Sequence, residues 1–160
     1  MSLTLRHVKA GTRLPTLRKV TTDEQLRLLY QRTLLLAKGI NDEFEKYSNG
    51  PNIHTDATAA RTAGFNGRVV TGHQIFSFLS EMLSLFFGIG WVEGGKIKIK
   101  FVRPLLMSEE ALCEGEVKKV SPCETKGEGR AKLAIWCKNA RGETVATGTA
   151  EARVLFDTAS

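Results

Sequence analysis

The chain has 160 residues and a net charge of +6; 42% of its residues are hydrophobic and 25% are charged. This composition is typical of a globular protein and excludes a disordered chain, and the length predicts a single domain spanning residues 1–160. The basic residues are scattered without a helix-turn-helix, RNP or zinc-finger pattern, so we expect no nucleic-acid partner.

The N-terminal part predicts a lead-in segment followed by a helix. Its basic residues have no apolar segment behind them, so we expect no signal peptide. Residues 14–20 form the lead-in segment, which Thr21 and Thr22 end. Thr22 and Gln25 have the spacing of a capping box, and apolar residues then recur at helical spacing. Gly39 is expected to end this helix.

Two shorter helical segments are predicted next. Residues 41–48 are polar and predict a short helical turn that leads into a loop. Asp56 is a candidate N-cap for a helix over residues 57–63, and Gly64 is expected to close that helix.

The segment that begins at Gly72 is the most apolar part of the chain. Between Ile75 and Phe87 few residues are polar, and a helix that is apolar nearly all round is one buried on most sides. We therefore predict that this segment is the core helix. The apolar stretch is short for a membrane span and contains Glu81, so we expect no membrane contact.

The C-terminal half predicts strands. Gly94-Gly95 is a hairpin signal. In residues 96–102 apolar and charged residues then alternate, with Ile97, Ile99 and Phe101 on one face and three lysines on the other. We therefore expect the lysine face of this strand to be exposed to water. Further strands are predicted over residues 111–120, 130–138 and 144–156. Alternation and helix burial alone predict an α+β fold with an antiparallel sheet.

Three cysteines, Cys113, Cys123 and Cys137, lie in or near these strands. Their odd number and the lack of a C-x-x-C or Cys/His cluster argue against a disulfide framework and against a zinc site. We expect reduced thiols, no metal and no redox cofactor, as is usual in the cytoplasm, where we expect this protein to be located.

The most informative segment is Asn49-Gly50-Pro51-Asn52-Ile53-His54, followed eighteen residues after the histidine by Gly72. It resembles the active-site region of the MaoC-like (R)-specific enoyl-CoA hydratases, whose motif reads D-x-N-P-x-H. The resemblance covers residues 16–156 and implies a hot-dog fold, in which an antiparallel sheet wraps a long central helix. It also implies a homodimer or higher even oligomer and an acyl-CoA or acyl-carrier-protein thioester as substrate.

The resemblance implies a role for each matching residue. In the family, a carboxylate and an imidazole hold one water, and a backbone N–H at the start of the central helix stabilises the enolate. Carried over, His54 is the imidazole, Gly72 supplies the N–H, and Ser80 lies on the helix near the site. Asn49 stands where the family has its Asp, and an amide cannot accept a proton near neutral pH.

Four explanations of Asn49 stay open. His54 acts alone as the base while Asn49 positions the water, or a nearby carboxylate (Asp42, Glu43 or Glu45) replaces the missing acid. Alternatively, the protein binds acyl-CoA without hydrating it. The fourth explanation is a hot-dog thioesterase, in which the Asn/His pair positions water at the thioester carbonyl.

Basic side chains near a cleft mouth would concentrate the phosphates of coenzyme A. Arg68 and Arg103 are candidates for this role, together with Lys98 and Lys100. His73 is placed at the start of the predicted core helix, where the positive end of the helix dipole disfavours an imidazolium. A neutral His73 is therefore a candidate to line the substrate pocket.

Overall fold

The computed structural model describes residues 5–37, 50–125 and 127–155, with only the backbone of residues 32–37. The chain forms two compact units, which we name the sheet unit and the loop unit. The sheet unit comprises Met1–Lys19, Gly72–Arg103 and Ala111–Ser160, and the loop unit comprises Val20–Thr71 and Pro104–Glu110.

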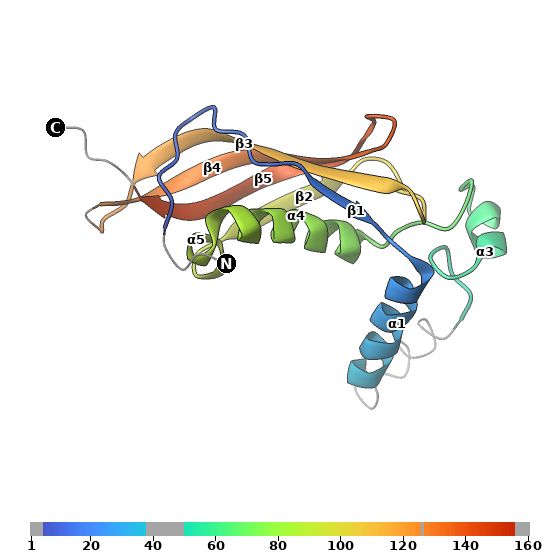
Figure 1. Ribbon diagram of the computed structural model, residues 1–160. Coiled ribbons are helices and arrows are strands. Elements are labelled where there is room, and N and C mark those ends of the chain that lie inside the picture. Colours follow the sequence, from blue (N-terminus) through green and yellow to red (C-terminus); the bar gives the residue numbers. More distant parts are fainter. Residues whose placement is uncertain (1–4, 38–49, 126, 156–160) are drawn as a thin grey trace. The chain divides into compact units, whose positions relative to one another are not determined.

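The sheet unit is built on a five-stranded sheet with the order β1-β3-β4-β5-β2 (Figure 1). The pairs β3–β4, β4–β5 and β5–β2 are antiparallel. Because β2 is the last strand in this order, it lies at one edge of the sheet. The strands are β1 (Leu17–Val20), β2 (Lys96–Phe101), β3 (Glu110–Pro122), β4 (Glu128–Asn139) and β5 (Thr144–Leu155). The four strands predicted in the C-terminal half are confirmed, with ends that differ by at most two residues.

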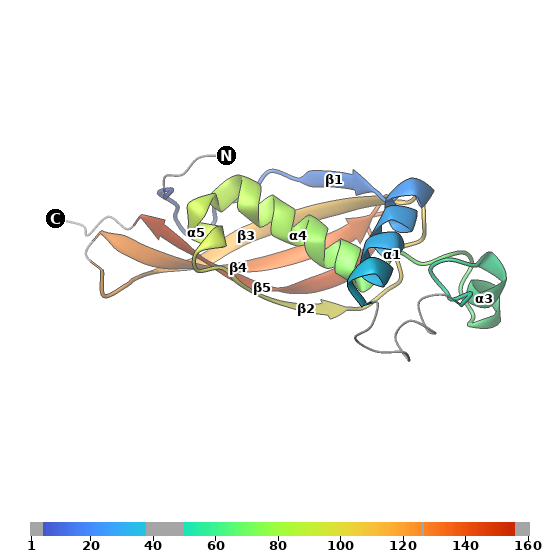
Figure 2. The same cartoon turned by 90° about the horizontal axis from the view of Figure 1, so that it is seen from below.

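Helix α4 (Gly72–Phe87) lies along one face of this sheet, as Figure 2 shows. Burying apolar side chains between a helix and a sheet removes them from water, which is the main driving force for this packing. The buried residues of α4 are Ile75, Leu79, Met82, Leu83 and Phe87. Along β3 and β4 buried residues alternate with half-buried or exposed ones, which is the period of a strand with one covered face.

The expectation that this helix is buried on most sides is wrong for the single chain. Phe76 is 43% exposed and Leu85 is 61% exposed, so the rest of the chain does not cover all of the apolar surface of α4. Among the described residues, no helix combines the length and the hydropathy that crossing a membrane requires.

The glycine pair before β2 does not form the predicted hairpin. A short helix, α5 (Ile89–Val92), precedes it, so no strand enters the turn from that side. A Cβ atom on Gly95 would lie 2.4 Å from the carbonyl oxygen of Trp91. Glycine is therefore required at this position by the close approach of the backbone, and not by a hairpin turn. The sequence pattern did not predict α5, because four residues are too few to show helical periodicity.

The loop unit contains the two other predicted helices, α1 (Asp23–Ala37) and α3 (Ala57–Thr62). The capping box is confirmed: Gln25 N–H donates to Thr22 Oγ1 over 3.2 Å, and Thr22 N–H donates to Gln25 Oε1 over 3.1 Å. Asp56 Oδ1 accepts from Ala59 N–H over 2.7 Å and caps α3 as predicted. The predicted helix end at Gly39 and the helical turn over residues 41–48 lie outside the described residues.

Candidate functional site

His54 lies in a turn that Asn52 organises. The side-chain oxygen of Asn52 accepts hydrogen bonds from the backbone N–H groups of His54 (2.9 Å) and Thr55 (3.2 Å), and its carbonyl accepts one from Asp56 N–H (2.9 Å). An asparagine that bonds the backbone two residues on is a stable turn former. The Asn at position 52 therefore fixes the backbone that carries the histidine.

The imidazole of His54 is oriented by a backbone carbonyl. Its Nδ1 lies 2.7 Å from the carbonyl oxygen of Val69, and the residue is half-buried. Since a carbonyl oxygen only accepts hydrogen bonds, Nδ1 carries the hydrogen, and in the neutral ring Nε2 keeps its lone pair. Val69 N–H in turn donates to the carbonyl of Ile53 over 2.9 Å, so two hydrogen bonds join the two segments.

The first position of the motif is not among the residues that the structure describes. Asn49 lies outside them, as do Asp42, Glu43 and Glu45, the carboxylates considered as substitutes for the family's acid. The described part of the site thus begins at Gly50.

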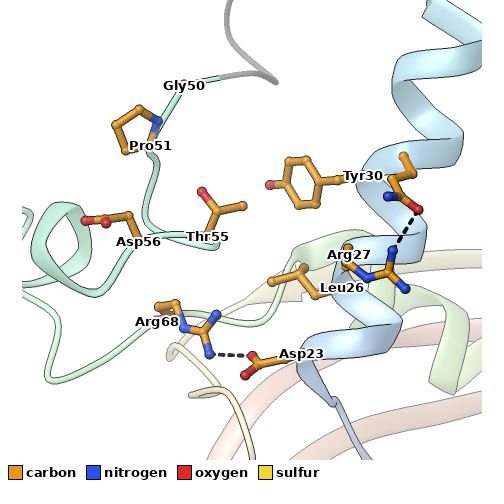
Figure 3. Close-up of a pocket in the computed structure, with 10 residues that line it drawn as sticks. Asp23, Leu26, Arg27, Tyr30, Gly50, Pro51, Thr55, Asp56 and Arg68 are labelled. Atoms are coloured by element: carbon orange, nitrogen blue, oxygen red, sulfur yellow. Dashed lines mark hydrogen bonds and ion pairs between the residues drawn. The ribbon is translucent and has the colours of Figure 1, made fainter.

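A pocket of about 430 Å³ lies in the loop unit between α1 and the turn that precedes α3 (Figure 3). Arg68 faces this pocket and forms an ion pair with the carboxylate of Asp23. The side chain of Arg68 is 27% exposed and that of Asp23 is 73% exposed, so this is a surface ion pair. The pocket is lined by Asp23, Leu26, Arg27, Tyr30, Gln31, Gly50, Pro51, Thr55, Asp56 and Arg68.

Gly72 is the first residue of α4, and the ring of Phe101 in β2 lies against it. A Cβ atom on Gly72 would be 3.1 Å from Cζ and 3.2 Å from Cε2 of that ring. The N–H of a first helical residue has no partner within its helix and can bind an external acceptor. Gly72 therefore has a packing role in the sheet unit, in addition to the close ligand approach that the sequence suggested.

We predict that Gly72→Ala stabilises the protein by less than the ~0.4–1 kcal/mol that alanine usually gains over glycine, because its methyl group meets the Phe101 ring. In a Phe101→Ala background the same substitution should be more favourable, since the obstructing ring is absent. Urea denaturation of the four proteins of this cycle measures the coupling. An equal effect of Gly72→Ala in both backgrounds would contradict the assigned contact.

The two other candidates on α4 have different surroundings. The hydroxyl oxygen of Ser80 accepts a hydrogen bond from Trp91 Nε1 over 3.1 Å, so it ties α4 to α5. The backbone carbonyl of His73 accepts from the Ser77 hydroxyl over 2.8 Å, and the histidine is exposed. Ser80 thus has a structural partner that its sequence position did not reveal.

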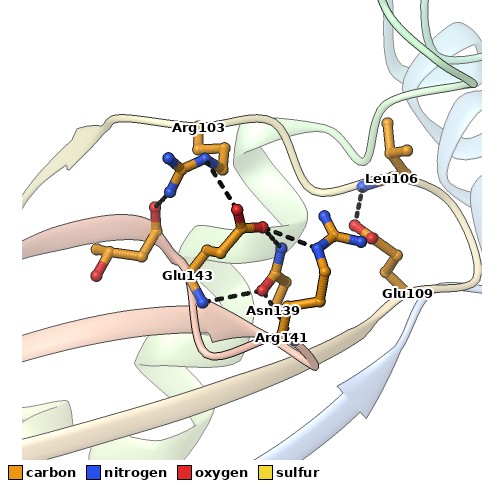
Figure 4. A network of polar contacts seen from close by, with 7 residues as sticks. Arg103, Leu106, Glu109, Asn139, Arg141 and Glu143 are labelled. Atoms are coloured by element: carbon orange, nitrogen blue, oxygen red, sulfur yellow. Dashed lines mark hydrogen bonds and ion pairs between the residues drawn. The ribbon is translucent and has the colours of Figure 1, made fainter.

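Arg103 belongs to a polar network at the β4–β5 hairpin, shown in Figure 4. Its guanidinium donates to the Thr144 carbonyl over 3.3 Å and lies 4.0 Å from the Glu143 carboxylate. Glu143 also accepts hydrogen bonds from Asn139 (2.7 Å) and Arg141 (3.0 Å), and these bonds hold the pKa of its carboxyl below the usual value. The described contacts of Arg103 therefore link this residue to the β4–β5 hairpin.

The candidate residues are divided between the two units. The loop unit carries His54 and Arg68, and the sheet unit carries Gly72, His73, Ser80 and Arg103. Sequence reasoning missed the Val69 carbonyl and the Phe101 ring. A carbonyl has no sequence signal, and neither the alternation of the strand nor the family resemblance indicated that the Phe101 ring contacts Gly72.

No protein-family model matches the chain, and no curated protein matches it in sequence. Solved structures do resemble it. The (R)-hydratase from A. caviae involved in PHA biosynthesis aligns with 20% identity and a TM-score of 0.63, over 93% of this chain and 98% of that one. The MaoC-like dehydratase from Rhodospirillum rubrum aligns with 17% identity and a TM-score of 0.64, over 95% and 96%.

A C-terminally truncated 3R-hydroxyacyl-ACP dehydratase complex from Mycobacterium tuberculosis is also similar, with 13% identity and a TM-score of 0.58, over 93% of this chain and 99% of that one. The likeness extends over nearly the whole chain in each case, while the identity stays at or below 20%. The five-stranded antiparallel sheet with α4 along one face matches the fold of these proteins. The chain has the hot-dog fold.

Proposed function

We propose that this protein is a MaoC-like enzyme that adds water to a trans-2-enoyl thioester, giving an (R)-3-hydroxyacyl thioester, or catalyses the reverse dehydration. The proposal is supported by the His54 and Gly72 positions of the motif and by the likeness to solved structures described as an (R)-hydratase and a MaoC-like dehydratase. The carrier of the acyl group is coenzyme A or an acyl carrier protein; one similar structure is described as acting on the latter.

The observation that carries the proposal is the contact of His54 Nδ1 with the Val69 carbonyl. It leaves Nε2 as the unprotonated nitrogen, which is the form that a general base requires. In the proposed reaction Nε2 takes a proton from water as the oxygen attacks C3. The electron pair moves through C2 to the thioester oxygen, the N–H of Gly72 stabilises this enolate, and C2 then receives a proton.

Asn49 changes which residue acts as the base in this proposal. The family's carboxylate is replaced by an amide, which orients a water but does not accept its proton. His54 therefore serves alone as the base, and we expect slower hydration than with a carboxylate present. The same replacement favours a second candidate, in which the protein hydrolyses a thioester or binds it without reaction.

We further propose that the protein acts as a homodimer in the cytoplasm. β2 lies at an edge of the sheet, and edge strands with apolar side chains favour pairing with another chain. Large exposed apolar side chains in the sheet unit support burial against a second copy: Phe76, Leu85, Val92, Phe101 and Val102. Light scattering should give twice the chain mass at micromolar concentration, and a folded monomer would refute the dimer.

The test of function is a pair of assays on the same sample. Crotonyl-CoA is incubated with the protein, loss of the enoyl absorbance reports hydration, and a thiol reagent reports release of coenzyme A. The hydratase proposal expects loss of the enoyl signal without thiol release, and an (R)-configured product. Thiol release would identify a thioesterase, and a ligand-dependent rise in melting temperature without turnover would identify a binding protein.

A further inference from the structure

Phe101 lies beside the backbone N–H to which the proposed function assigns the thioester oxygen. It is the last residue of β2, and Gly72, which carries that N–H, is the first residue of α4. A Cβ atom on Gly72 would lie 3.1 Å from Cζ, 3.2 Å from Cε2 and 3.7 Å from Cε1 of the Phe101 ring. The tip of the ring therefore packs against the start of the helix, and both residues belong to the sheet unit.

Strand β5 holds the backbone around this ring. Phe101 is paired with Ala146 in the antiparallel register, and Ala146 is fully buried. The next two N–H groups, of Val102 and Arg103, both donate to the Val145 carbonyl, over 2.9 Å and 3.2 Å. Side chains carried by a strand keep a more precise position than side chains on a loop. The strand pairing therefore holds the ring at a defined place beside α4.

A thioester bound to the Gly72 N–H lies close to the ring. The first N–H of a helix has no partner within the helix, and an oxygen that accepts from it lies about 2.9 Å from the nitrogen. Two further bonds place C2, the carbon next to the carbonyl, within roughly 5 Å of this nitrogen. The nearest ring atom lies within roughly 6 Å of it, because the Cβ position is two bonds from the nitrogen. Phe101 is 49% exposed, so part of the ring is open to a ligand.

We propose that Phe101 is a specificity-determining residue, whose ring admits enoyl thioesters with hydrogen on C2 and excludes those with a methyl branch there. This inference rests on the proposed function, because that function places the thioester oxygen on the Gly72 N–H. On the other side of the carbonyl, the sulfur has no free valence for a branch, so substrates differ this close to the ring only at C2. The substrate class is therefore trans-2-enoyl thioesters that are unbranched at C2.

The kinetic test compares kcat/KM for crotonyl-CoA with kcat/KM for its 2-methyl derivative, tiglyl-CoA. The ratio of the two should fall by about tenfold or more in Phe101→Leu, because leucine lacks the ring atoms that lie against Gly72 and one misfitting methyl group costs about that much. The matched control is Leu85→Ala, which removes another exposed apolar side chain about 20 Å along α4 and should keep the wild-type ratio. An unchanged ratio in Phe101→Leu, or an equal fall in Leu85→Ala, would overturn the proposal.

A binding measurement separates this inference from the proposed function. Isothermal titration uses propionyl-CoA and its 2-methyl derivative, isobutyryl-CoA, neither of which can be hydrated. The wild type should bind propionyl-CoA about tenfold or more tightly than isobutyryl-CoA, and Phe101→Leu should bind the two about equally. If this preference is found and crotonyl-CoA is not hydrated, the proposed function fails and the role of Phe101 stands. Equal affinities in the wild type would refute that role even if the variant folds poorly, and binding of neither thioester would refute both proposals.

Discussion

Replacing His54 by alanine is expected to lower kcat/KM for hydration of a short trans-2-enoyl-CoA by about 10²–10⁴-fold, the usual contribution of a general base. The reason is the loss of Nε2, which the Nδ1 contact with the Val69 carbonyl leaves free to accept a proton. The measurement is the initial rate of loss of the enoyl absorbance at several substrate concentrations. Because the base acts on the chemical step, kcat should fall with little change in KM.

The matched control is His7→Ala, which removes an exposed imidazole outside the motif. It should leave the rate unchanged, and both variants should retain cooperative thermal unfolding. If His54→Ala keeps more than about a tenth of the wild-type rate, well above what loss of a general base allows, His54 is not the base and the proposed mechanism is wrong.

Asn49→Asp is expected to raise the hydration rate by up to about a hundredfold, because it restores a proton acceptor of nearly the same size at the position of the family's acid. His54→Ala should remove most of the activity both in the wild-type background and in combination with Asn49→Asp. A wild type that already hydrates as fast as Asn49→Asp would mean that position 49 does not take the place of the family's acid, and the assignment of Asn49 would be wrong.

This comparison needs a chemical control. Asn49 is followed by Gly50, and glycine lets the backbone nitrogen reach the side-chain amide carbon, so the asparagine is prone to deamidation. An aged wild-type sample would acquire aspartate at this position and some of the variant's activity. Intact-mass analysis of each preparation must therefore accompany the rates.

The sequence predicted those parts of the fold that depend on local patterns. The capping box of Thr22 and Gln25, the Asp56 cap and the alternation along β2 each require neighbours only a few residues away. The failures came from contacts that no such pattern shows. Gly95 was read as a hairpin residue because its close neighbour, the carbonyl of Trp91, belongs to a helix too short to show a pattern.

For the candidate site, too, the sequence predicted what a local motif shows and missed the contacts made by residues farther along the chain. His54 stands out by its motif, but its tautomer depends on a carbonyl fifteen residues away. Ser80 was assigned to the substrate, yet its described partner is the indole of Trp91 in a helix that was not predicted. Arg103 was assigned to phosphates, and its contacts with Glu143 and Thr144 depend on a hairpin whose geometry no local pattern gives.

The hydrogen bond between His54 Nδ1 and the Val69 carbonyl affects which substitutions position 69 tolerates. The acceptor is a peptide carbonyl, so the hydrogen bond itself does not depend on the side chain at position 69. The side chain is constrained separately, because Val69 is 8% exposed and a replacement must be apolar to stay buried. Proline is excluded for another reason, because it would remove the N–H that Val69 donates to Ile53. Comparison of related chains would therefore show interchangeable apolar residues at this position beside a fixed histidine, although its backbone holds the histidine in its reactive form.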